Sequence, residues 1–348
     1  MKRLSYEQAQ RLLRIHRYVQ RSHLKNRRRG SRSRNTEDTP YKSFFAPEEF
    51  CLLGPLRNEL IAYISNIKKH ILDGRRKIII DFSRTRKFIA DGTLYFYAEI
   101  DRLLDCYKNL NFKCVPPLND KASQVLQQIG FYGRIGAPQR KNCSDAEVVN
   151  WRAARGQGAL GEKYDEILGS YDGHITEALS SELYTGLTEA MTNAHHHAYL
   201  FPRGDGVYTS PSYKPWWMFS QEKDGLLTVV FCDLGVGIPG SLPRSKDEGW
   251  QRWWAVMKKL GFHTQGDALI IRGAVRHSRT RTELHNRGKG LRQIIETVSA
   301  IPSGKAIIQS NKGCYRISEG HETFNDRRTS INGTILFWQL PLSERPSS

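Results

Sequence analysis

Apolar residues in the first third of the chain alternate between helical and strand patterns. An apolar helix is predicted within "FFAPEEFCLLGPLRNELIAYISNIKKHILDG", ending at Gly74, and a buried strand within "RKIIIDFS", closed by Asp81. A second helix ("DGTLYFYAEIDRLLDCY"), a short strand ("NFKCVPP") and a third helix ("DKASQVLQQIGFY") follow. Because this alternation is typical of α/β folds, residues 38–136 are predicted to form a small α/β domain.

The second half of the chain has longer apolar patterns. The stretch "ELYTGLTEAMTNAHHHAY" predicts an amphipathic helix, and "PWWMFSQEKDGLLTVVFCD" predicts two strands around the turn "EKDG". A helix that begins near Gly290 and a strand in "SINGTILFWQLP" complete a second predicted domain, residues 173–348. Residues 137–172 are polar and mixed, and we expect a connector with some helix there.

The amphipathic helix carries a carboxylate and a carboxamide beside its apolar stripe. At about 100° per residue, Glu189, Asn193 and His197 share the face next to the stripe, whereas His195 points to the opposite, solvent side. A carboxylate there can take a proton from water, and a carboxamide oxygen can bind Mg²⁺. Three consecutive histidines diverge around a helix, so we do not expect them to converge on one metal ion. The stripe consists of Leu183, Leu187, Ala190, Met191, Ala194 and Ala198.

Three later segments combine glycines with polar residues at the ends of predicted elements. "DLGVGIP" follows a buried strand, "RGKGL" begins a helix, and "NGTILFWQLP" is the last strand. Free backbone N–H groups at a helix start, with neighbouring positive charge, form an anion site. The residues of interest are Asp233, Gly235 and Gly237 in the first segment, Arg287, Gly288, Lys289 and Gly290 in the second, and Thr334 in the third.

In their order along the chain, "EAMTNAHHHAY", "DLGVGIP", "RGKGL" and "NGTILFWQLP" resemble the N box, G1 box, G2 box and closing strand of the GHKL superfamily. This superfamily contains the ATP-binding domains of gyrase, heat-shock chaperones, histidine kinases and MutL. The resemblance covers residues 173–342. It implies a two-layer α/β sandwich of the Bergerat type with a mixed sheet, and it implies ATP and Mg²⁺ as cofactors.

The resemblance also implies roles for individual residues. Asn193 would bind the Mg²⁺ that bridges the ATP phosphates, and Asp233 would accept the adenine amino group, with Thr334 supporting the adenine pocket. The two G1-box glycines would let the backbone approach the base. Residues 287–290 would cradle the phosphates, and His197 would be a packed residue or a neighbour of the phosphates.

Three functions remain open at this point. Glu189 stands where hydrolytic GHKL members carry the general base, which favours an ATPase whose nucleotide state regulates a protein partner. The alternatives are a serine/threonine kinase of the anti-sigma-factor type and a binding module that does not hydrolyse ATP. The segment between the G1 and G2 boxes corresponds to the ATP lid and is rich in Trp, Lys and Arg. It is either packed on its own domain or forms a partner or dimer surface.

The first domain resembles a STAS domain, the fold of anti-sigma-factor antagonists, over residues 76–135. In that family, a serine in the turn before a helix accepts phosphate from a partner kinase. Here the turn reads "FIADGTL", with Asp91 near the acceptor position and Thr93 reaching it only in a shifted register. We therefore do not expect phosphorylation at this turn, and the resemblance implies an internal regulator instead. A generic α/β domain is the alternative interpretation.

The charge of the chain is concentrated at its start. The formal net charge is +18, and the first 35 residues contain twelve Lys or Arg against one Glu. Residues 1–37 are predicted to form a basic arm with a short helix and a linker. Such an arm either contacts nucleic acid non-specifically, through residues 1–36, or is a solvated tail.

Other bulk features exclude several classes of protein. No apolar run is long enough to span a bilayer, and the start lacks the apolar core of a secretory signal, so we expect a cytoplasmic protein without membrane contact. The six cysteines contain no CxxC pair, and we expect free thiols. The Trp- and Arg-rich lid segment leaves a homodimer as one alternative for the assembly.

Overall fold

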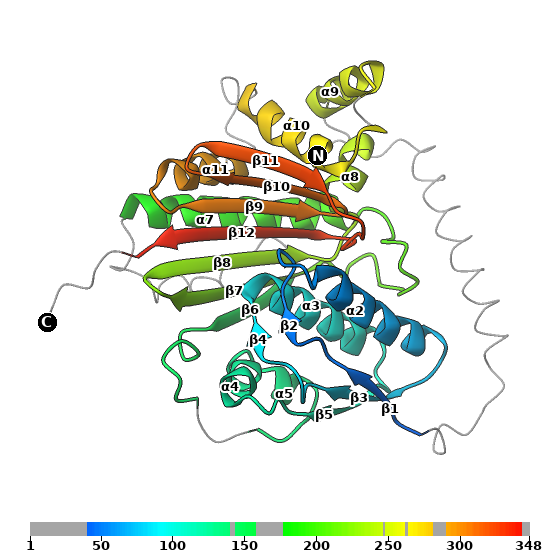
Figure 1. The fold of residues 1–348 in the computed structure, drawn as a ribbon. Helices are drawn as coiled ribbons and strands as arrows, with labels where there is room; N and C mark the ends of the chain where they lie inside the picture. The colour runs from blue at the N-terminus through cyan, green and yellow to red at the C-terminus, as the bar shows by residue number, and fades with distance from the viewer. Residues whose placement is uncertain are drawn as a thin grey trace, which may run out of the picture.

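The computed structural model describes residues 40–139, 143–157, 177–245, 248–261, 264–280 and 290–342. The predicted basic arm, residues 1–37, lies outside the described residues. The described chain is a mixed α and β structure built around a small parallel sheet and a large antiparallel sheet (Figure 1).

The N-terminal layer is the parallel sheet with its helices. Strand β3 lies between β1 and β5 and pairs with both in parallel, as expected where helices connect the strands. Helix α2 ends at Leu72, and Gly74 follows with φ 88°, which confirms the predicted helix end. The elements are β1 (Lys42–Phe45), β2 (Glu49–Phe50), α2 (Arg57–Leu72), β3 (Lys77–Asp81), β4 (Lys87–Phe88), α3 (Ala90–Cys106), β5 (Asn111–Val115), α4 (Asp120–Gln128) and α5 (Phe131–Arg134).

The antiparallel sheet has the strand order β11-β10-β9-β12-β8-β7-β6. Each pair of neighbours in it is antiparallel, so the expected mixed sheet was wrong. Tight turns account for three of the six pairs, joining β7 to β8, β9 to β10 and β10 to β11 with positive φ at Asp224, Asn311 and Glu319, whereas the other three pairs join strands distant in sequence. The strands are β6 (Arg152–Gln157), β7 (Pro215–Lys223), β8 (Leu226–Asp233), β9 (Lys305–Ser310), β10 (Gly313–Ser318), β11 (His321–Asp326) and β12 (Thr334–Pro341).

Strand β6 corrects the expectation for residues 137–172. We expected a connector with some helix there, but residues 152–157 extend the large sheet at its edge by pairing with β7. The residues alternate only weakly between buried and exposed, because an edge strand of small and charged residues has little apolar pattern to detect. Residues 158–172 lie outside the described part of the chain.

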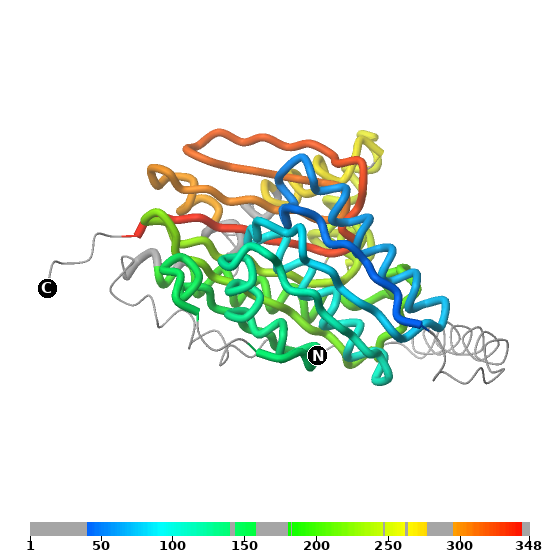
Figure 2. Tube along the Cα trace, turned by 60° about the horizontal axis from the view of Figure 1, so that its bottom comes forward, coloured from blue at the N-terminus to red at the C-terminus, as the bar shows by residue number. Residues whose placement is uncertain are grey.

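The two faces of the large sheet contribute to two different cores. On β7, Trp216 and Met218 face helices α7 (Glu177–Asn193) and α11 (Gly290–Ala300), whereas Trp217 and Phe219 join the core of the N-terminal layer. In both views the N-terminal layer, coloured blue to cyan, lies along one side of the sheet (Figures 1 and 2). The helix-and-sheet arrangement expected for the second domain therefore becomes three layers, with α3 packed against β7 and β8.

None of the described helices is both long enough and apolar enough to cross a membrane.

Candidate functional site

Helix α7 carries the first of the four motif segments and continues into a π-helical turn, η2 (Ala194–Ala198). The predicted apolar stripe is confirmed, because none of its side chains is more than 7% exposed and all of them pack in the core beneath α7. In the same core lie Trp216 and Trp338 of the sheet. Burial of the stripe determines which face of α7 lies against the sheet and which remains available for chemistry.

Glu189 and Asn193 lie one turn apart on α7, as the helical spacing predicts. The Asn193 Nδ2 atom donates a hydrogen bond to Glu189 Oε1 at 3.2 Å, and both side chains are half-buried. Burial raises the pKa of Glu189, and the hydrogen bond from Asn193 opposes this with a smaller effect. A raised pKa suits a carboxylate that must accept a proton near neutral pH. Because the Asn193 amide nitrogen is engaged, its carboxamide oxygen is the atom left to bind a hard cation.

The three histidines lie in the π-helical turn, and their exposure differs from our expectation. His195 is half-buried, whereas His196 and His197 are exposed, so the prediction that His195 points to solvent was wrong. The reason is the i→i+5 bonding of a π-helix, which changes the angular spacing of side chains after Asn193. The His195 Nδ1 atom is buried without a hydrogen-bond partner among the described residues, and burial lowers the pKa of the ring. In the described ranges, no three His, Cys, Asp or Glu side chains group together in a way that could hold a metal.

Asp233 ends the central strand β8 and is buried at the edge of the large sheet that is formed by the ends of its strands. Its neighbour across the sheet is Thr334, the first residue of β12, whose side chain hydrogen-bonds to it. The backbone N–H of Gly235 donates to Asp233 Oδ1 at 3.0 Å. Burial raises the pKa of Asp233 to about 6, although these two hydrogen bonds and the charge of Arg203 lower it. Within the described residues Asp233 forms no salt bridge, Arg203 being paired with Glu99 and Asp205 instead.

The loop after Asp233 packs directly against the end of the π-helical turn. Val236 N–H donates to Ala198 O at 2.8 Å, and a Cβ atom at Gly235 would lie only 2.3 Å from the same oxygen. The Tyr199 hydroxyl accepts a hydrogen bond from Leu234 N–H at 2.9 Å. The N-box-like and G1-box-like segments are thus in contact. The sequence pattern did not single out Tyr199, because a tyrosine after a helix carries no signal of a partner distant in sequence.

The other G1-box glycine faces the hairpin between β9 and β10. Gly237 has φ 75°, and a Cβ atom there would lie 2.7 Å from Asn311 Oδ1. Asn311 Nδ2 also donates to Val236 O at 2.9 Å, and Ser310 Oγ accepts from Ile238 N–H at 2.8 Å. The space in front of both glycines is therefore filled by protein atoms, whereas the resemblance implies close approach to a base. In this chain the two glycines allow the loop to pack between η2 and the hairpin.

Ser310 extends the polar edge around Asp233. Its hydroxyl lies 3.1 Å from the Thr334 hydroxyl, and Thr334 pairs with Ser310 on one side and with Asp233 on the other. The carboxyl ends of β8 and β9 and the amino end of β12 thus meet at one edge of the sheet. Ser310 and Asn311 were missed by the sequence analysis because Ser and Asn at a strand end are equally typical of a simple turn.

The fourth motif segment is described only at its end. Gly290 begins α11, and Arg287, Gly288 and Lys289 lie outside the described residues. Helix α11 lies beside α7, and its Ile295 shares the core with the apolar stripe. The described residues therefore bring together the segments that contain Asn193, Asp233 and Thr334. Helix α11, which follows the fourth segment, lies beside α7.

The STAS-like turn has a structural role. Asp91 is fully buried, and its carboxylate accepts hydrogen bonds from Leu52 N–H at 3.1 Å and Gly92 N–H at 2.7 Å. A Cβ atom at Gly92 would lie 2.4 Å from the Cys51 backbone nitrogen, and Thr93 is also fully buried. Neither the carboxylate nor the hydroxyl of this turn is accessible to a kinase.

Neither a scan against protein-family models nor a search of curated proteins found a match to this chain. A carboxylate offers about four lone-pair positions, and at Asp233 the described chain provides donors from Gly235 and Thr334. The arrangement leaves Asp233 able to accept a further N–H donor from a ligand.

Proposed function

We propose that this protein binds Mg-ATP at the Asp233 edge of the large sheet, in the manner of the GHKL superfamily, and hydrolyses it. The observation that carries this proposal is the environment of Asp233. It is a 6% exposed carboxylate that forms no salt bridge within the described residues, beside a strand partner that offers a hydroxyl. Buried carboxylates ordinarily have a charged partner, so one that lacks a salt bridge and lies where Thr334 and Ser310 also meet is a candidate ligand-binding group.

Adenine fits the donors and acceptors at this edge. Its exocyclic amine would donate to the Asp233 carboxylate, and the Thr334 hydroxyl, 3.1 Å from Ser310, can accept a hydrogen bond from a bridging water. A site that hydrogen-bonds a buried amine rejects analogues that lack it, because the carboxylate is then left without its partner. Guanine carries a carbonyl at the equivalent position, so we expect ATP to bind more tightly than GTP.

Hydrolysis is supported by the pair on α7. Glu189 would accept the proton of the attacking water, and its burial favours that role by raising its pKa. Asn193 holds this carboxylate through its amide nitrogen, and its carboxamide oxygen would bind Mg²⁺. When bound, Mg-ATP supplies the phosphoryl group and neutralises charge on it. The remaining phosphate contacts in the proposal come from residues 287–290, by resemblance alone.

The binding step is tested by titration calorimetry of the full chain with Mg-ATP. We expect Asp233→Asn to weaken binding at least about tenfold, the effect of losing a hydrogen bond to a charged group. His196→Ala is the matched control, because His196 is exposed on the turn that adjoins the site. Absence of ATP binding in the wild-type protein would overturn the proposed function entirely.

The chemical step is tested by phosphate release. We expect Glu189→Gln to lower the rate by about 10²- to 10⁴-fold while ATP still binds, as is usual when a general base is removed. Asn193→Ala should lower the rate and raise the Mg²⁺ concentration that half-maximal activity requires. If the wild-type protein binds ATP but releases no phosphate, the hydrolytic role of Glu189 is wrong. Transfer of the γ-phosphate to a co-incubated protein would instead indicate a kinase function.

Regulation of a protein partner is the last part of the proposal. It is supported by the resemblance to nucleotide-controlled switches and by the intimate contact of the site with a second layer of the molecule. Chemical crosslinking in a cell extract, with and without Mg-ATP, tests it. A set of crosslinked partners that is identical in both conditions would contradict it.

A further inference from the structure

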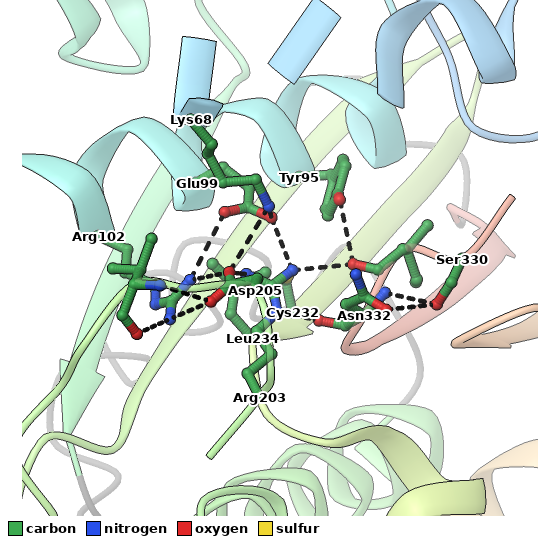
Figure 3. Close-up of polar contacts among 12 residues, drawn as sticks. Lys68, Tyr95, Glu99, Arg102, Arg203, Asp205, Cys232, Leu234, Ser330 and Asn332 are labelled. Carbon is green, nitrogen blue, oxygen red and sulfur yellow. Dashed lines mark hydrogen bonds and ion pairs between the residues drawn. The ribbon is translucent and has the colours of Figure 1, made fainter. Parts of the chain in front are cut away.

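Five charged side chains are buried between the N-terminal layer and the large sheet (Figure 3). None of their side chains is more than 9% exposed. Two are anions and three are cations, and they come from helices α2 and α3 and from the loop that follows η2. They are Lys68, Glu99, Arg102, Arg203 and Asp205.

Arg203 is the residue that joins this network to the rest of the molecule. One Arg203 Nη atom donates to Glu99 Oε1 at 2.6 Å, and the other donates to Asp205 Oδ2 at 3.0 Å. The same guanidinium also donates to the backbone oxygens of Ile331, at 2.9 Å, and Asn332. Arg203 therefore holds a carboxylate of α3 and the loop before β12 at the same time.

That loop leads directly into the proposed adenine pocket. Asn332 has φ 47°, a conformation that needs support in a non-glycine residue. Gly333 follows so closely on Asp233 that a Cβ atom there would lie 2.5 Å from the Asp233 backbone oxygen. Thr334, which hydrogen-bonds the Asp233 side chain, comes next. A change in the position of Arg203 would thus move Thr334 and Asp233, which lie only a few backbone residues from its contacts at Ile331 and Asn332.

Helix α3 supports the same loop through a second contact. The Tyr95 hydroxyl donates to Ile331 O at 3.0 Å, one turn before Glu99 on the helix. Lys68 of α2 donates to Glu99 Oε1 at 3.0 Å and so orients the carboxylate that Arg203 uses. Burial raises the pKa of Asp233, and the charge of Arg203 opposes that rise.

We infer that Arg203 is a positioning residue of the nucleotide site, and that the N-terminal layer regulates nucleotide binding through the Lys68–Glu99–Arg203 ion pairs. This inference rests on the proposed function. Helix α3 carries the Glu99 carboxylate that orients Arg203, and α2 carries Lys68, which orients Glu99. A ligand or partner that shifts these helices would therefore change the affinity for adenine without contacting the pocket. Reciprocally, ATP would stabilise the ion pairs.

A neighbouring, more exposed network provides a control, since the Arg155 side chain is 35% exposed against 3% for Arg203. Arg155 of β6 forms ion pairs with Asp101 at 2.8 Å and Asp105 at 2.7 Å, both on α3. It therefore also links the large sheet to the N-terminal layer through an arginine and two carboxylates. Both of these carboxylates lie on α3, and neither lies on the loop before β12. We expect loss of Arg155 to perturb the same interface without removing a contact to the loop before β12.

The experiment compares Glu99→Gln, Arg203→Lys and Arg203→Met with Arg155→Met in the full chain. Binding of a ribose-labelled fluorescent ATP analogue measures the affinity, and its competition by ATP and by GTP measures the base discrimination. Hydrogen exchange of the backbone amides of residues 331–336, without nucleotide, measures how well the loop before β12 is ordered. We expect Glu99→Gln and Arg203→Met to weaken ATP about tenfold, a typical coupling between sites. Arg203→Lys should keep most of the stability yet lose ATP-over-GTP discrimination, because an ammonium cannot hold two carboxylates and two carbonyls as the planar guanidinium does.

The outcomes separate this inference from the proposed function. If wild type binds ATP and the Glu99 and Arg203 variants bind it equally well with unchanged discrimination, the inference is wrong and the proposed function stands. The same conclusion follows if Arg155→Met produces equal losses in discrimination, since the effect is then general destabilisation. If wild type binds no ATP, both fail. Should Arg203→Met not fold, Glu99→Gln and Arg203→Lys decide the matter.

Discussion

The two faces of the large sheet are covered in different ways. The face beneath α7 and α11 is joined to its helices by apolar side chains, and the buried carboxylate of Asp233 lies at the ends of its strands. The face beneath α3 adds a network of buried ions to an apolar core, with Glu99 fully buried. Apolar contact is non-directional, whereas ion pairs and their hydrogen bonds fix an orientation. The difference indicates that the α2–α3 layer is held in one specific position relative to the sheet.

The largest expected effect is on the ionic face. Glu99→Gln removes one anion from beneath Lys68 and Arg203, and breaking a buried ion pair usually costs about 3–5 kcal/mol. Since ion pairing holds the pKa of Glu99 well below its usual range, the stability it provides is present above about pH 4.5 and is lost as pH falls further. Chemical denaturation of both proteins from about pH 2 to pH 7 measures this. A stability difference that does not shrink toward low pH would contradict the electrostatic explanation.

On the apolar face we expect a similar loss without the pH dependence. Leu187 is 1% exposed in the stripe of α7, and Leu→Ala changes in such positions cost about 2–5 kcal/mol. No titratable group is removed, so the difference from wild type should stay constant over the pH range in which Glu99→Gln varies. The same denaturation series measures it. A pH-dependent loss would mean that the two faces do not differ as described.

At the edge between the faces, Asp233→Asn should stabilise the protein while weakening ATP binding. The pKa of Asp233 is raised from 3.8 to about 6, so the folded state holds its proton more tightly than the unfolded state. Ionised Asp233 is therefore unfavourable above that range, and the variant should gain up to about 3 kcal/mol at pH 7 and above. The gain should decline as pH falls through 6 and vanish below about 4. Loss of stability at pH 8 would show that Asp233 is a structural residue.

The smallest effect is expected for the exposed histidines of the π-helical turn. His196→Ala should leave the melting temperature and ATP affinity unchanged, because the side chain is exposed. His195→Ala, unlike His196→Ala, should change the melting temperature, because the His195 ring is half-buried. Thermal unfolding of the two variants, with and without Mg-ATP, distinguishes them. Equal behaviour of both would mean that burial of His195 contributes nothing to the site.

Sequence patterns predicted the elements that depend on neighbouring residues. The helix end at Gly74, the apolar stripe of α7, the turn "EKDG" and the adjacency of Glu189 and Asn193 were all confirmed, because each depends on spacing within one element. The all-antiparallel sheet and strand β6 were not predicted. Both depend on which distant strands pair, and β6 has no apolar alternation to reveal it.

The sequence by itself determined which residue types could do chemistry and placed them in order along the chain. Only the tertiary structure decided that Asp233, Thr334 and Ser310 meet at one sheet edge, and that Arg203 joins this edge to Glu99 of another layer. Helical periodicity is a local property that the backbone repeats every few residues. Strand pairing and buried ion pairs join residues more than 100 positions apart, as Arg203 and Glu99 are, and only packing brings them together.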